Sequence, residues 1–107
     1  MTKEQLENYQ TIKQEAAYLH RKASSAKWRE DDRADILQNH WQEKTAEADE
    51  ALLSIEAALA VLDPEERQIL RLRYIEGMSW TQVALRSHYG RSTVFRIHAR
   101  ALKKLNK

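Results

Sequence analysis

The sequence of 107 residues contains no cysteine, one proline and two glycines, and it has no long apolar run. The lack of cysteine excludes disulfide bonds and thiolate metal sites. Few prolines and glycines mean few interruptions of regular structure, which favours an all-α fold. No apolar stretch is long enough to cross a bilayer, and the first ten residues lack the layout of a signal peptide. We therefore expect a cytoplasmic protein.

Acidic residues are missing from the C-terminal end of the sequence. From Gly77 onward there are seven lysines and arginines and no acid. Residues 1–62 hold eight basic and twelve acidic residues (net −4), whereas residues 63–107 hold ten and four (net +6). Such a basic segment is typical of one that faces a polyanion, although a solvated basic tail would have the same charge.

The first 62 residues contain apolar side chains at three- and four-residue spacing, which predicts two amphipathic helices. The first series is Leu6, Tyr9, Ile12, Ala16, Leu19, Ala23 and Ala26. The second is Leu37, Trp41, Thr45, Ala48, Leu52, Ile55, Leu59 and Leu62. We predict an antiparallel helical hairpin over residues 1–62, with one longer, interrupted coiled coil as the alternative. Because the first series is rich in alanine, the hairpin is also expected to bury its remaining apolar surface against a second copy, as a homodimer, or against the C-terminal domain. Residues 1–62 are therefore expected to serve oligomerisation or partner binding.

Between the two series lies "SSAKWREDDRAD". Ser24 and Ser25 are expected to weaken the first helix. Asp31 or Asp32 is expected to cap the second, with Asp35 near its first turn.

The second half begins with "LDPEER", which predicts a helix start. Asp63 is a good N-cap, Pro64 fits the first helical position, and Glu66 can reach back to the cap. The adjacent Glu65 and Glu66 are therefore interpreted as capping residues rather than as catalytic acids. The helix should end at Gly77, which tolerates a left-handed backbone.

Two further helices follow in short order. "SWTQ" repeats the start signal with Ser79 and Gln82 and predicts a helix over about 80–87. "HYGR" then breaks the chain, and a third helix is predicted over about 91–104. His88 is expected to take a positive φ in the turn. Gly90 is a weak N-cap, so a start at Ser92 is the alternative.

A helical wheel divides the third helix into two faces. The buried face is predicted to hold Val94, Ile97, Ala101 and Leu105. The opposite face carries only hydroxyl and basic side chains: Ser92, Thr93, Arg96, Arg100, Lys103, Lys104 and Lys107. Two short helices with such a second member describe a helix-turn-helix, whose second helix enters the major groove of DNA. Backbone amides near Ser79, Trp80 and Thr81 are well placed for a phosphate.

Residues 62–105 resemble region four of bacterial sigma factors, through the Leu-Asp-Pro start, "LRYIEGMSW", "STV" and "ARALKKL". With the helical N-terminal extension, the whole chain resembles phage late transcription regulators of the RinA and ArpU type. The resemblance implies binding to double-stranded promoter DNA and activation of phage genes in the host bacterial cytoplasm, with host RNA polymerase as a further partner. The positions that it implies for DNA contact are Arg91, Ser92, Thr93, Phe95, Arg96 and Arg100.

Lys103 and Lys104 are expected nearer the DNA backbone, where they supply sequence-independent attraction. Phe95 either contacts a thymine methyl group or packs against a neighbour, and both interpretations stay open. No region two is present in the sequence, so we expect an activator or adaptor rather than a complete sigma factor.

The remaining candidate residues point away from catalysis. The four histidines have no ligand spacing and are expected at the surface or in turns, without a metal or cofactor. The three tryptophans are expected in core or interface packing. No nucleophile with a base and no phosphate-binding glycine loop is found, so an enzyme is not expected. Two other functions stay open: a small terminase-like DNA-packaging protein, and a protein-interaction inhibitor module.

Overall fold

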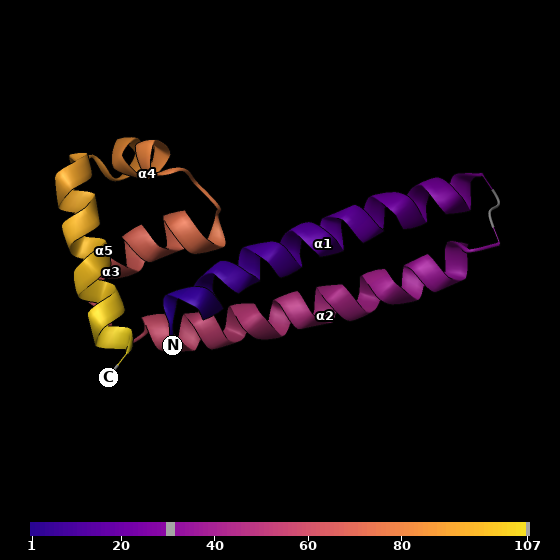
Figure 1. Cartoon of the computed structure of the whole chain (residues 1–107), viewed down its shortest axis with the longest axis horizontal. Coiled ribbons are helices and arrows are strands. Elements are labelled where there is room, and N and C mark those ends of the chain that lie inside the picture. The colour runs from indigo at the N-terminus through magenta and orange to yellow at the C-terminus, as the bar shows by residue number, and fades with distance from the viewer. Residues whose placement is uncertain (30–31, 107) are drawn as a thin grey trace.

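The computed structural model describes residues 1–29 and 32–106. Two long helices form a hairpin, and shorter helices gather at its open end (Figure 1). The molecule measures 52 × 28 × 18 Å, because the hairpin extends well beyond the short helices. The all-α fold predicted from the sequence is confirmed, and the described residues form no strand. Within them, no helix is long and apolar enough to cross a membrane.

Helix α1 (Lys3–Trp28) begins with a capping box. The backbone N–H of Gln5 donates to Thr2 Oγ1 at 3.2 Å, and that of Thr2 donates to Gln5 Oε1 at 2.8 Å. The helix continues through Ser24 and Ser25, where we expected it to weaken. Ala23 and Ala26 on either side are buried, so tertiary packing stabilises this stretch against its low propensity.

Helix α2 (Ala34–Leu59) returns antiparallel to α1, so the predicted hairpin is confirmed and the interrupted coiled coil is not (Figure 1). The rings of His20 and Trp41 lie 4.7 Å apart across the hairpin. Lys44 Nζ lies 3.1 Å from Glu15 Oε2 in the other helix. Both predicted apolar series lie along the contact, and none of their members is exposed.

Asp32 does not cap α2, so that prediction is wrong. The N-cap is Arg33, with helical φ and ψ and no side-chain cap hydrogen bond, and Asp31 lies outside the described residues. Asp35 does lie in the first turn, where its charge favours the positive helix end. The helix therefore begins without the side-chain oxygen that an aspartate would supply.

Helix α3 (Pro64–Leu70) begins as predicted, with Asp63 as N-cap and its N–H donating to Glu66 Oε1 at 2.9 Å. It continues directly into a π-helical turn, η1 (Arg71–Ile75), which the sequence did not predict. The chain then turns at Gly77 with φ +71°, which confirms the positive φ expected there. The short helices that follow are α4 (Trp80–Ser87) and α5 (Arg91–Leu105).

The root of the hairpin and the C-terminal helices share one apolar core. Its largest fully buried side chains are Leu6 of α1, Ile55 and Leu59 of α2, and Leu70 of α3. Ala101 and Leu105 of α5 pack into the same cluster. The division into units 1–62 and 63–107 stays a prediction, but the two parts are packed directly on each other.

The tryptophans differ in their environments. Trp41 and Trp80 are half-buried, as packing residues should be. Trp28, at the end of α1, is 89% exposed, so it does not pack in the core, and its expected role in an interface stays a prediction. It lies at the far end of the hairpin, away from the shared core (Figure 1).

Candidate nucleic-acid interface

Helices α4 and α5 form the two arms of a helix-turn-helix. Helix α4 begins with the predicted capping box: Gln82 N–H donates to Ser79 Oγ at 3.2 Å, and Ser79 N–H donates to Gln82 Oε1 at 2.9 Å. Val83 and Val94 are fully buried in an apolar cluster between the arms. The second arm therefore has a fixed position relative to the first.

The turn between the arms has the backbone that we predicted. His88 adopts the left-handed conformation with φ 65°. Gly90 is the N-cap of α5 and offers no side-chain hydrogen bond, and the N–H of Val94 donates to its carbonyl at 3.0 Å. The helix begins at Arg91, so the alternative start at Ser92 is wrong.

The buried face of α5 contains the four predicted apolar residues and also His98. The Tyr74 hydroxyl lies 2.6 Å from His98 Nε2, and the Trp80 ring centroid lies 4.7 Å from the imidazole centroid. Burial, helped by Lys3 and Arg73, lowers the pKa of His98 to about 4, and burial raises the pKa of Tyr74 to about 12. A neutral phenol therefore faces a neutral imidazole at physiological pH.

The expectation that all four histidines lie at the surface or in turns is thus wrong for His98. On the helical wheel His98 falls on the same side as Val94, and this position could have predicted its burial. Its hydrogen-bond partner comes from another helix, so the sequence could not show how its polar atoms are satisfied.

The first half of α5 presents the residues that the sequence proposed for base contact. Arg91, Ser92 and Arg96 are exposed, and Thr93 is half-buried. Within the part of the chain that the structure describes, no carboxylate pairs with Arg91 or Arg96. This end of the helix is therefore an exposed basic and hydroxyl surface.

Phe95 packs against a neighbour, as one of its two interpretations expected, and contact with a thymine methyl group stays a prediction. Its ring lies edge-on to Trp80 with the centroids 5.0 Å apart, yet 43% of the residue is exposed. The guanidinium carbon of Arg73 also lies over the Trp80 ring, 4.6 Å from the ring centroid. The aromatic pair thus joins the start of α4 to α5 and still leaves Phe95 partly exposed.

The start of α4 provides a second polar surface. Ser79 and Thr81 are exposed. The amides of Trp80 and Thr81 have no acceptor within the helix, because they belong to its first turn. The amide of Ser79 already donates to Gln82, so it is not available for a phosphate.

The second half of α5 is different, because α3 supplies it with acids. Arg100 Nε lies 3.0 Å from Glu66 Oε2, and its Nη2 lies 2.7 Å from Glu65 Oε1. Lys104 Nζ lies 2.8 Å from Glu66 Oε1 and 3.2 Å from Asp63 Oδ2. Glu65 and Glu66 therefore do more than cap α3. No pattern in the sequence signalled these pairs.

The electrostatics of this network centre on Glu66, whose side chain has no exposed surface. Burial by itself would raise the pKa of Glu66. Hydrogen bonds from Lys104, from the Asp63 N–H and from Arg100 outweigh that effect and hold it below its usual value. The hydrogen bond to Glu66, together with one to the Asp63 side chain, raises the pKa of Lys104. Glu66 is thus a charged group fully compensated inside the fold.

A surface hollow of about 420 Å³ lies between α3 and the basic face of α5. Its lining residues are Glu65, Tyr89, Thr93, Arg96, Ile97 and Arg100. It therefore joins the exposed first half of α5 to the ion pairs of the second. In the described residues, no three histidine or carboxylate side chains come together as a metal would require.

The geometry of two short helices, a tight turn and an exposed basic second helix is that of a DNA-binding domain. Residues 58–107 match the family model of sigma-70, region 4. This part of the chain therefore has a helix-turn-helix fold similar to region four, as the resemblance implied. Comparisons with curated proteins and with solved structures gave no match.

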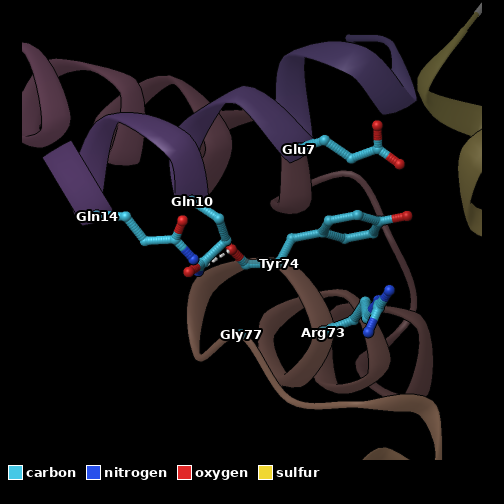
Figure 2. A pocket seen from close by; sticks show the side chains of 6 residues that line it. All are labelled: Glu7, Gln10, Gln14, Arg73, Tyr74 and Gly77. Carbon is cyan, nitrogen blue, oxygen red and sulfur yellow. Dashed lines mark hydrogen bonds between the residues drawn. The ribbon is translucent and has the colours of Figure 1, made fainter.

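The region 4 match begins at residue 58, inside α2, and so it includes part of the shared core. Figure 2 shows a further attachment, where Gln10 of α1 lies against the chain that leads to α4. Its Nε2 donates to the carbonyls of Tyr74 and Ile75 at 2.6 and 2.8 Å. These carbonyls lie at the end of the π-helical turn, where the helix stops. The hairpin therefore satisfies backbone groups of the segment that matches region 4.

Proposed function

We propose that the protein is a sequence-specific double-stranded DNA-binding transcription regulator that inserts α5 into the major groove. The observation that carries the proposal is the exposed, unpaired basic start of α5 within a region 4 helix-turn-helix. Arginine can pair with a guanine edge through two hydrogen bonds, and short hydroxyl side chains can approach either type of base pair.

The proposal assigns different tasks to different residues. Arg91, Ser92, Thr93 and Arg96 read base edges, and the exposed part of Phe95 contacts a thymine methyl group. Lys103 and the amides of Trp80 and Thr81 contact phosphates. Arg100 and Lys104 are also proposed to lie close to the DNA backbone. In the protein without DNA, however, both form ion pairs with acids at the start of α3.

The hairpin is proposed to be the part that associates with a second copy or with the transcription machinery. Its support is a set of large apolar side chains left exposed on α1 and α2: Tyr18, Trp28, Ile36 and Leu53. Unpacked apolar surface of this kind favours an interface. We further propose that the protein acts on phage promoters together with host RNA polymerase, as regulators of the RinA and ArpU type would.

Selection of bound sequences from a random duplex pool tests the proposal. A defined motif is expected, and two half-sites about one helical turn or a multiple apart would indicate a dimer. Arg96→Ala should weaken binding to the selected site by about 1–3 kcal/mol and relax the preference at one position. The matched control is Arg21→Ala, which removes an exposed arginine from the hairpin. No enrichment of any sequence, or equal losses for both variants, would contradict the proposal.

A further inference from the structure

Arg100 lies between two carboxylates that differ in one respect. Glu66 Oε2 accepts from its Nε and Glu65 Oε1 accepts from its Nη2. The side chain of Glu66 has no exposed surface, whereas those of Glu65 and Arg100 are each 46% exposed. One carboxylate is therefore enclosed by protein, and the other is at the surface.

Only Glu65 can leave Arg100 at low cost. Glu66 also accepts hydrogen bonds from Lys104 and from the Asp63 N–H. Moving Glu66 would therefore leave its buried charge without these partners. Glu65 is half-exposed, and water can replace Arg100 as its partner. Surface ion pairs of this kind contribute little and exchange readily.

The position of the pair places it beside the proposed DNA contact. Glu65 and Arg100 line the same hollow as Thr93 and Arg96. A phosphate oxygen that approaches this hollow is attracted by two guanidinium groups and repelled by one carboxylate. Glu65 offers Arg100 the same charge-assisted hydrogen bond that a phosphate would offer.

We propose that Glu65 competes with the DNA backbone for Arg100, so that binding requires the exchange of a carboxylate for a phosphate. This inference rests on the proposed function. Because the released carboxylate stays beside the DNA, the exchange leaves the charge of the site unchanged. Glu65 thus lowers affinity for every DNA sequence, and it separates Arg100 from Arg96 in function although both lie on one face of α5.

The test is Glu65→Gln, measured by fluorescence anisotropy on the selected duplex and on a random duplex over a series of salt concentrations. Removing a surface competitor should tighten binding to both by roughly 1.5- to 5-fold. The slope of log K against log salt should steepen by about one unit, since no released carboxylate then offsets the charge that Arg100 brings to its phosphate. Circular dichroism and thermal unfolding check that the variant is folded.

Two controls separate competition from a general change in charge. Glu76→Gln removes an exposed carboxylate from the turn after η1 and should change affinity much less. In an Arg100→Ala background, Glu65→Gln should lose most of its effect, because no guanidinium remains to be released and only the repulsion between the carboxylate and phosphate is removed. An effect of full size in that background would overturn the inference, as would unchanged or weaker binding by Glu65→Gln alone. A wild-type protein that binds no DNA would overturn the proposed function as well.

Discussion

The two halves of α5 carry the same kinds of residue on the same face, but they lie in different electrostatic surroundings. Arg96 in the first half is exposed to solvent. Arg100 and Lys104 in the second half are held by acids from the start of α3. A basic face on a helical wheel is therefore not a uniform DNA-binding surface, because a neighbouring helix can compensate part of it.

The largest expected effect follows from removing the centre of that compensation. Glu66→Gln keeps the shape of the side chain but loses the charge that Arg100 and Lys104 share. We expect the free energy of unfolding to fall by about 1–3 kcal/mol, less than for a fully buried pair because both cations are partly exposed. Urea denaturation measures it, with Glu76→Gln as the control. An unchanged urea midpoint would mean that the ion pairs with α3 do not stabilise the second half of α5.

The same residue gives a pH dependence. The pKa of Glu66 is lower in the folded protein than its usual value of 4.5. Its contribution to stability is therefore complete above that value and is lost as the pH falls through the folded pKa. The stability difference between wild type and Glu66→Gln should shrink in that acidic range, and a constant difference would contradict the role of the charge.

Arg100→Ala sharpens the comparison between the halves on DNA. Because Arg100 must give up Glu65 to reach a phosphate, we expect its loss to cost less than about 1 kcal/mol of binding. Arg96 has no carboxylate partner among the described residues, so Arg96→Ala should cost more on the selected site. Anisotropy titrations at one salt concentration compare the two. Equal losses would show that α3 does not weaken the second half of the interface.

Local signals in the sequence predicted the fold well where the interactions are local. The cap residues Asp63 and Ser79 and the left-handed His88 depend on neighbours within a few positions, so their sequence patterns were sufficient. The wheel also placed the apolar face of α5 correctly, because burial follows the helical period.

Contacts between distant segments could not be predicted in this way. Arg100 pairs with residues 34 and 35 positions away, and Tyr74 supplies the partner of His98 from another helix. Gln10 reaches carbonyls more than 60 positions along the chain. Each of these contacts depends on how helices cross, and neither charge nor periodicity in one segment specifies that crossing.

The smallest expected effect compares adjacent lysines near the end of α5. Lys103 is exposed, whereas Lys104 is held by Asp63 and Glu66. If both lie near the DNA backbone, Lys103→Ala should make the salt slope shallower by about one unit, since it neutralises one phosphate. Lys104→Ala should change the slope clearly less, because the acids that compensate it remain beside the DNA. Affinities measured on a random duplex at several salt concentrations give both slopes. A full unit lost with Lys104 would mean that DNA releases this lysine from α3, and the contrast between the two halves of α5 would then end at Arg100.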